Sequence, residues 1–288
     1  MKKIFFAILL TCLSAHCFAQ QNYFITWLSG GTSMTLDDLS WTTTKFGGGG
    51  TIGLGYQWQK NLFIVNIGFE ASFQDRNIGL NDTTFRSRIV DSEHESFIYN
   101  GEVINRNDQL LALDANIPIM LGVQTDNFYF LAGVKLSVNG IGWTRQRGYF
   151  STQGDYDRFY ETLTDMPNHN FHTYELVKTS STRWLNTELL GSLELGAVAA
   201  IVPEKFRIKV GFFADLGIIQ FGTRSGLNSI AQPNPSDPFV IDLTHVYFSR
   251  EGCDAKLHNL NAGMKVTFEI LPNHKGKCVV CEWNHWRY

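Results

Sequence analysis

Beyond its first twenty residues, the sequence lacks any long hydrophobic run. No stretch there approaches the roughly 18 consecutive apolar residues that a membrane-spanning helix needs. Charged residues are also scarce, at 18% against a usual quarter, and the formal net charge of −3 gives no reason to expect a nucleic-acid partner. Aromatic residues (14%) and glycines (26) are plentiful instead. This combination favours an all-β chain with a lipid-facing surface.

The first hydrophobic run has the features of a targeting signal. Met1–Lys3 is basic, Ile4–Leu10 is apolar, and Cys17 and Ala19 place small residues at the −3 and −1 positions of a cleavage site. We predict that residues 1–19 are a signal peptide, removed after Ala19. A permanent membrane anchor is the alternative, but the apolar run is too short for one. Cleavage leaves three cysteines in the mature chain, at Cys253, Cys278 and Cys281.

Leu62–Gln74 shows the pattern around which the rest of the chain is organised. Every second residue is apolar: Phe63, Val65, Ile67, Phe69, Ala71 and Phe73. After Ile64, the residues between them are small or polar: Asn66, Gly68, Glu70, Ser72 and Gln74. A period of two places successive side chains on opposite faces of a strand. One apolar face and one polar face are typical of a transmembrane β-strand, with lipid outside and a polar interior.

Seven further stretches are predicted to be strands, most of them with the same alternation: 21–33, 46–58, 109–123, 128–142, 183–202, 206–221 and 257–270. Three connections are tight turns, at 59–61, 125–127 and 203–205. Four are longer and polar, at 34–45, 77–108, 144–181 and 222–256. Short turns on one side and long loops on the other are the arrangement of a transmembrane barrel, and eight strands place both termini on the short-turn side, the periplasm.

The pattern therefore predicts an all-β fold, an eight-stranded antiparallel up-and-down transmembrane β-barrel. The barrel would span residues 20–270, and residues 271–288 would form a periplasmic tail. A soluble lipocalin-like barrel is the alternative, because alternation alone does not say which face is inside. The signal peptide, the glycines on the polar face and the number of aliphatic side chains favour the membrane version.

Charged residues on the predicted inner face form a candidate network. They are Glu70, Asp114, Lys135, Glu188, Glu194, Arg207, Lys209, Asp215, Lys265 and Glu269. An eight-stranded barrel has an interior just wide enough for side chains to fill. Because unpaired buried charges are untenable, we expect these side chains to pair and to plug the interior instead of lining a pore.

Several motifs resemble those of the PorT-like outer-membrane β-barrel proteins of Bacteroides-type bacteria. They are the FAQQ end of the signal peptide, the hairpin FGGGGTIGLGYQW…LFIVNIGFEASF, the strands NIPIMLG and FYFLAGVKLS, and the final strand NAGMKVTFEI with its short cysteine-containing tail. The resemblance covers most of the mature chain. It implies an outer-membrane location, and it brings no catalytic signature.

The tail carries a possible metal site in the motif HKGKCVVCEWNH. His274, Cys278, Cys281 and His285 offer two thiols and two imidazoles, the ligand types of tetrahedral zinc. A Cys278–Cys281 disulfide in an oxidising periplasm is one alternative, and an uninvolved tail is another. In the third long loop, His169 and His172 lie near four acidic residues that suit a cation or a sugar: Asp155, Asp157, Glu161 and Asp165.

We expect a non-enzymatic outer-membrane protein, either structural or acting as a surface-binding or assembly partner through its long loops. Its partners would be outer-membrane lipid and lipopolysaccharide, and a protein bound at the extracellular loops or the periplasmic tail, without a cofactor. One alternative is an enzyme acting on lipid A or peptides, for which His94 with Ser92 or Ser96 and Glu93 or Glu95 is the nearest local set. A small-solute channel is the other.

Overall fold

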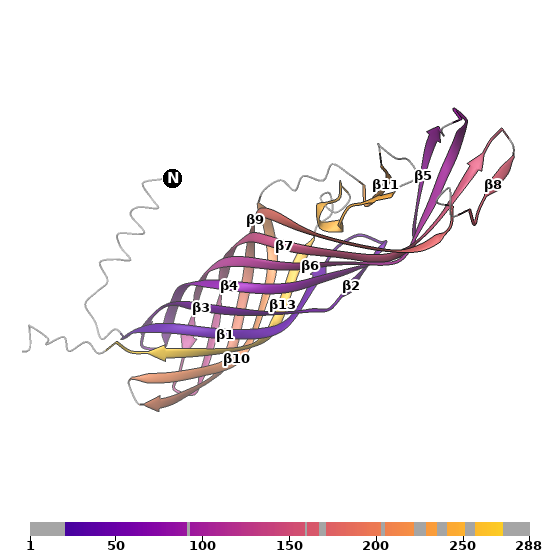
Figure 1. The fold of residues 1–288 in the computed structure, drawn as a ribbon. Helices are drawn as coiled ribbons and strands as arrows, with labels where there is room; N and C mark the ends of the chain where they lie inside the picture. Colours follow the sequence, from indigo (N-terminus) through magenta and orange to yellow (C-terminus); the bar gives the residue numbers. More distant parts are fainter. Residues whose placement is uncertain are drawn as a thin grey trace, which may run out of the picture.

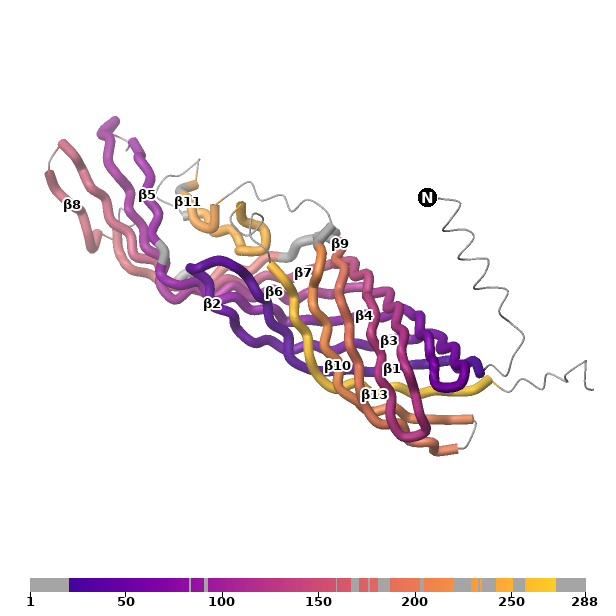
Figure 2. The backbone as a smooth tube through the Cα atoms, turned by 180° about the vertical axis from the view of Figure 1, so that it is seen from behind, coloured from indigo at the N-terminus to yellow at the C-terminus, as the bar shows by residue number. Residues whose placement is uncertain are grey.

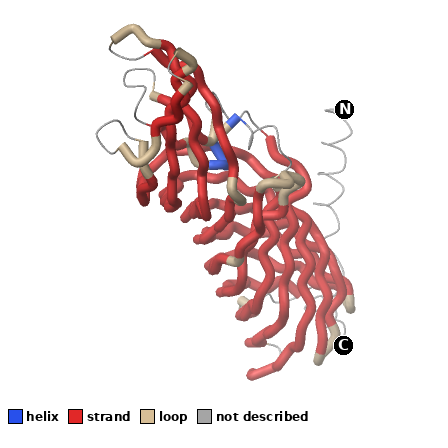
Figure 3. Tube along the Cα trace, turned by 90° about the vertical axis from the view of Figure 1, so that its right-hand side faces the viewer, coloured by secondary structure: helices blue, strands red, loops and turns tan. Residues whose placement is uncertain are grey.

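The computed structural model describes residues 21–90, 93–158, 160–166, 171–202, 205–221, 229–234, 241–250 and 257–272. Most of these residues lie in antiparallel β-strands (Figure 3). The predicted signal peptide and most of the predicted tail, with all four candidate metal ligands, lie outside the described residues. Among the described residues, no helix is long and apolar enough to cross a membrane.

Eight strands form a closed ring (Figure 1). In ring order they are β1 (Gln21–Leu36), β3 (Gly47–Lys60), β4 (Phe63–Leu80), β6 (Ser96–Gln124), β7 (Phe128–Tyr156), β9 (Thr173–Val202), β10 (Phe206–Phe221) and β13 (His258–Ile270). Each strand pairs antiparallel with the next, and the pairing of β1 with β13 closes the ring. The predicted antiparallel arrangement of eight strands is confirmed.

Both described ends of the chain lie at the end of the ring that carries the tight turns. Phe24 near the start of β1 pairs with Ile270 at the end of β13. Gln21 pairs with Gln59 beside the β3–β4 turn, where Asn61 adopts the left-handed conformation with φ of 54°. An asparagine tolerates this conformation better than most residues, which suits a tight hairpin.

Among the described residues, six smaller elements lie outside the ring. They are β2 (Thr42–Lys45), β5 (Thr83–Val90), β8 (Glu161–Leu163), β11 (Ala231–Pro233), β12 (Ile241–Leu243) and a 3₁₀ helix, η2 (Val246–Phe248). β5 pairs with β6 and β8 pairs with β7, so both widen the sheet beyond the ring. β11 and β12 form a separate two-stranded sheet.

Three ring strands are far longer than the others. β6 and β7 have 29 residues each and β9 has 30, whereas β13 has 13. At about 3.3 Å per residue, 29 residues extend over about 95 Å and 13 residues over about 43 Å. The long strands therefore project well beyond the ring at the end opposite the tight turns, and Figures 1 and 2 show this extension carrying β5 and β8.

The extension consists largely of residues that the sequence predicted to be loops. Residues 77–108 and 144–181 are polar connections in the sequence-based prediction, yet most of them are strand. The alternation is present but confined to short stretches, as where Phe97, Tyr99 and Val103 are buried and Asn100 and Glu102 are more exposed. Polar residues on the solvent-exposed side of a sheet make such a stretch resemble a loop.

The two faces of the ring differ sharply in polarity. Its outer face exposes apolar side chains, among them Ile52, Leu54, Ile67, Phe69, Ile117, Ile119, Leu136, Leu193, Leu195, Phe212 and Met264. They lie beside one another across strand pairs: Leu54 faces Phe69, and Phe212 faces both Leu195 and Met264. We name this surface the apolar band. The inner face carries buried polar and charged side chains.

Glycines on the inner face leave room for the large Trp27 side chain. A Cβ atom on Gly53 would lie 2.2 Å from Trp27 Cε2, and one on Gly68 would lie 2.5 Å from its Cη2. Real Cβ atoms do not approach other atoms so closely, so both positions need glycine if the indole is to fill the interior. The glycines of the β3–β4 hairpin thus serve interior packing.

Candidate functional site

The predicted charged residues come together inside the ring. Nine of the ten are buried, and Arg207, near the tight-turn end, is partly exposed. The strands place these side chains inward because each alternates with an apolar residue of the outer face. Neighbouring strands then bring acids and bases within reach although they are far apart in the sequence.

Lys135 is the centre of one group. Its Nζ lies 2.8 Å from Asp215 Oδ2 and 3.5 Å from Glu70 Oε1. Glu70 also accepts hydrogen bonds from Trp27 Nε1 and Asn116 Nδ2, both at 2.9 Å. The cation is therefore shared by two carboxylates that neutral donors also satisfy, as buried charges require.

Glu269 and Glu194 organise the group toward the tight-turn end. Lys209 Nζ lies 2.7 Å from Glu269 Oε1, and Arg207 Nε lies 3.7 Å from its Oε2. Gln124 donates a hydrogen bond to Glu269 at 3.2 Å. Lys265 pairs with Glu194. Each of these carboxylates thus has a cationic partner on a neighbouring or facing strand.

Arg76 completes the set and is absent from the sequence-based prediction. Its Nη2 lies 2.9 Å from Asp114 Oδ2, and both side chains are buried. Glu188 accepts two hydrogen bonds of 2.8 Å from Asn259 Nδ2. Arg76 lies beyond the predicted end of its strand at Gln74, so the alternation that identified the other charges was not followed far enough to include it.

Apolar clusters fill the interior beside these charges. At the tight-turn end, the cluster is Ile64, Met120, Tyr129, Leu131 and Val198. At the other end, the cluster is Ile78, Leu80, Leu110, Ala112, Val246, Tyr247 and Leu257. A cavity beside Asp215 and Asn261 has a volume of about 20 Å³, room for about one water molecule. Among the described residues, buried side chains thus occupy the interior of the ring at both clusters and between them.

The cluster at the end opposite the tight turns includes residues from the connection between β10 and β13. We name residues 229–234 and 241–250 the mouth segment. Arg106 on β6 donates to Asp108 at 2.7 and 2.8 Å, and to the carbonyls of Ile230 at 2.7 Å and Thr244 at 2.5 Å. Asp108 accepts a hydrogen bond from the Val246 amide at 2.8 Å. This buried ion pair fastens the mouth segment over the end of the ring.

His245 strengthens the attachment as a neutral imidazole. Its Nδ1 accepts from the Tyr247 amide at 3.3 Å, so Nε2 carries the proton that is donated to the Gln109 carbonyl at 3.2 Å. Burial lowers the pKa of His245, although the nearby Asp108 carboxylate favours its charged form. Burial alone would raise the pKa of Asp108, but Arg106, His245 and the hydrogen bond from the Val246 amide together outweigh it, and the pKa is lowered.

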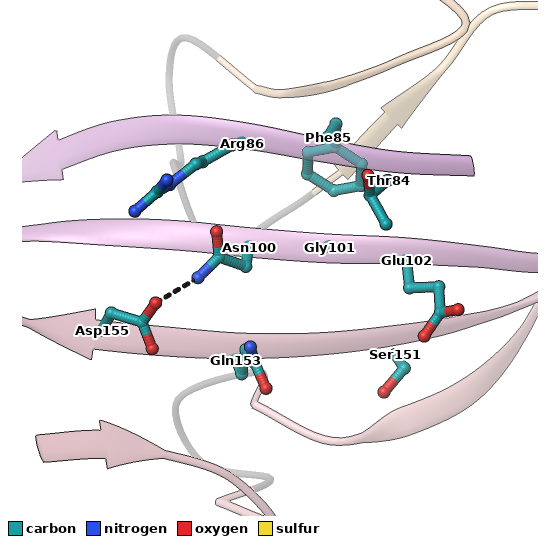
Figure 4. Close-up of a pocket in the computed structure, with 9 residues that line it drawn as sticks. All are labelled: Thr84, Phe85, Arg86, Asn100, Gly101, Glu102, Ser151, Gln153 and Asp155. Atoms are coloured by element: carbon teal, nitrogen blue, oxygen red, sulfur yellow. Dashed lines mark hydrogen bonds between the residues drawn. The ribbon is translucent and has the colours of Figure 1, made fainter.

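The extension carries an exposed polar groove of about 470 Å³ on β5, β6 and β7 (Figure 4). Its polar lining residues are Thr84, Arg86, Asn100, Glu102, Ser151, Gln153 and Asp155. Asn100 Nδ2 donates to Asp155 Oδ2 at 2.6 Å, and Thr162 donates to Asp155 Oδ1 at 2.8 Å. Behind this face lies a buried cluster that includes Phe97, Tyr99, Phe150 and Phe171. Asp155 is the only groove residue among the predicted site residues.

The other predicted sites do not assemble in the described part of the chain. No group of three His, Cys, Asp or Glu side chains suited to a metal ion occurs there. His94 is exposed in a left-handed conformation with φ of 63°, and Glu95 pairs with Arg158. The His172 ring packs against Tyr174 at 5.1 Å, while His169 and Ser92 lie outside the described residues.

Comparisons with known proteins give no family for this chain. No protein-family model matches it, and no curated protein matches it by sequence. Among solved structures, Ail, the attachment invasion locus protein of Yersinia pestis, matches at 11% identity over 86% of this chain and 98% of that chain, with a TM-score of 0.26. Ail in complex with the heparin analogue sucrose octasulfate matches at 11% identity over 86% and 99%, with a TM-score of 0.27. Scores this low support no conclusion, and the resemblance to PorT-like proteins stays a prediction.

Proposed function

We propose that the mature chain is an outer-membrane β-barrel whose ring crosses the bilayer and whose extended sheet stands outside the cell. The observation that carries this proposal is the polarity of the ring. Phe69 and Phe212 on its outer face are 52% and 60% exposed, whereas their chain neighbours Glu70 and Gly211 face inward with the buried charges. In water, exposure of such an apolar band would be unfavourable. In a bilayer the same side chains would contact the hydrocarbon chains of the lipid.

The ring also meets the backbone requirement of a bilayer. Its shortest strand, β13, has 13 residues, more than the roughly 9–11 that a tilted strand needs to cross. Closure between β1 and β13 pairs the backbone groups that an open edge would leave unsatisfied in lipid. Bacterial barrels have short periplasmic turns and long extracellular loops, so the tight-turn end would face the periplasm with both chain termini.

The favoured activity is binding at the cell surface, without catalysis. The filled interior and the fastened mouth segment argue against a solute channel. The separation of His94 and His172 from a nucleophile or a metal-binding group argues against an enzyme acting on lipid A or peptides. The extension instead offers a broad sheet backed by a buried hydrophobic cluster, and lipid and lipopolysaccharide would surround the ring below it.

Fractionation of a Gram-negative host tests the membrane assignment. The protein should separate with the outer membrane, need detergent for extraction, and migrate faster on a gel when unheated than when boiled. Recovery in the soluble periplasmic fraction would contradict the proposal. Planar-bilayer recordings, with a porin as positive control, test whether side chains block the interior. A blocked interior predicts no steady conductance, so steady conductance by the native protein would contradict it.

A further inference from the structure

We propose that the polar groove on β5, β6 and β7 binds an oligosaccharide. This inference rests on the proposed outer-membrane function and names the ligand class of the extended sheet. The groove lies on the solvent side of a sheet whose other side is packed with aromatic residues, including Phe97 stacked on Tyr156 with ring centroids 4.7 Å apart. The backbone of such a supported sheet holds the attachment points of its side chains in fixed relative positions, which reduces the entropy lost on binding.

Strand register arranges the groove as a grid of polar groups. Thr84, Glu102 and Ser151 are paired across the three strands in one row. Arg86, Asn100 and Gln153 form the next row. Strands lie about 4.8 Å apart and successive same-face rows about 7 Å apart, so donors and acceptors recur at the scale of a sugar ring and its hydroxyl groups.

The chemistry of the grid suits hydroxyl groups. Amides such as Gln153 both donate and accept, carboxylates such as Glu102 accept strongly, and serine and threonine hydroxyls do either. Asp155 is already oriented by its bonds from Asn100 and Thr162. Among the described residues, Arg86 and Glu102 have no hydrogen-bond or ion-pair partner, so both remain available to a ligand.

Other ligand classes fit the groove less well. A bound peptide strand would add along a free sheet edge, which β5 offers at the side of the groove, whereas the backbone groups of the central strand β6 are paired on both sides and most of the lining is polar. Nucleic acid needs a basic surface, and the groove carries one guanidinium against two carboxylates. A polyhydroxylated ligand uses all of these groups.

Arg86 adds a preference within the saccharide class. Its planar guanidinium matches a carboxylate with two parallel hydrogen bonds. It shares a row with Asn100 and Gln153, whose amides suit the hydroxyls next to such an acid group. We therefore expect sugars that carry a carboxylate, such as uronic or sialic acids, to bind better than neutral ones.

A glycan array probed with the full protein folded in detergent tests the site. The array holds neutral, carboxylated and sulfated oligosaccharides. We expect the native protein to be retained on carboxylated glycans. Glu102→Gln should bind them at least about tenfold more weakly. Arg86→Gln should lose the preference for carboxylated over neutral glycans. Asp126→Asn and Lys205→Gln, in exposed turns at the opposite end of the ring, are the charge-matched controls and should bind as the native chain does.

Three outcomes would overturn the inference: no retention of any glycan, equal retention by native and groove variants, or binding confined to sulfated glycans and unchanged by Glu102→Gln. The gel shift on heating is measured on every sample, so a misfolded variant is recognised. A native protein that shows the shift but binds no glycan removes the saccharide site and leaves the membrane assignment standing. Absence of the shift in the native protein counts against the membrane assignment itself.

Discussion

Replacing Asp108 by asparagine should release the mouth segment from the end of the ring. The carboxylate has two ion-pairing hydrogen bonds from Arg106, at 2.7 and 2.8 Å, and a third hydrogen bond from the Val246 amide at 2.8 Å. Both charged side chains are fully buried. The substitution leaves the guanidinium without its counter-charge, facing only the carbonyls of Ile230 and Thr244.

The magnitude follows from breaking a buried ion pair by removing one partner, which costs about 3–5 kcal/mol. The ladder of the ring does not depend on Asp108, so we expect this cost to fall on docking of the mouth segment and not on closure of the ring. At about 1.4 kcal/mol per tenfold change, docking should weaken by a factor of about 150 to 5,000.

Hydrogen exchange at the Val246 amide measures this docking equilibrium directly. Exchange in Asp108→Asn should accelerate by about the factor above, while the strand amides of β13 keep their protection. Arg106→Gln combined with Asp108→Asn should recover part of the loss, because no uncompensated charge stays buried. Asp126→Asn is the control in an exposed turn. Unchanged protection of Val246 in Asp108→Asn would refute the reasoning.

Acid should loosen the same attachment. The pKa of His245 is lowered when the mouth segment is docked. Once the pH falls below the ordinary histidine pKa of about 6.5, the imidazole of the undocked segment takes up a proton more readily than that of the docked one, and docking weakens. The lowered pKa of Asp108 also makes docking weaker in acid. The stabilisation of docking by Asp108 is present above the ordinary carboxyl pKa of about 4, and it is lost as the pH falls through the lower pKa that Asp108 has when the segment is docked. Protection factors of Val246 should fall between pH 7 and 5, and His245→Gln should flatten that range.

Three further substitutions test the ring. Phe69→Arg on the apolar band should cost about 2–4 kcal/mol in urea unfolding from lipid vesicles, and a tolerated arginine would mean that the outer face does not contact hydrocarbon. Lys135→Met should cost about 3–5 kcal/mol in the same assay, because Glu70 and Asp215 lose their shared cation. Gly53→Val should cost about 1–3 kcal/mol by displacing Trp27, and a double-mutant cycle with Trp27→Ala should show coupling if the two positions are in contact.

Sequence reasoning reached furthest where one face of a strand is continuously apolar. Leu62–Gln74 and its seven counterparts were predicted as strands, and they form the ring. Where the sheet leaves the apolar band, polar residues on its exposed face interrupted the signal. β5 and the outer parts of β6, β7 and β9 were therefore missed, together with the groove at Arg86 and Glu102.

The sequence by itself determined which residues share a face, because a strand sends successive side chains to opposite sides. That was enough to place Glu70, Lys135 and Asp215 on one surface. Only the tertiary structure decided that they meet, because closure of the ring brings Lys135 to Glu70, 65 positions away in the chain, and to Asp215, 80 positions away. The attachment of the mouth segment is of the same kind. Arg106 and Asp108 bind backbone groups more than a hundred residues away, and backbone groups leave no mark in the amino-acid pattern.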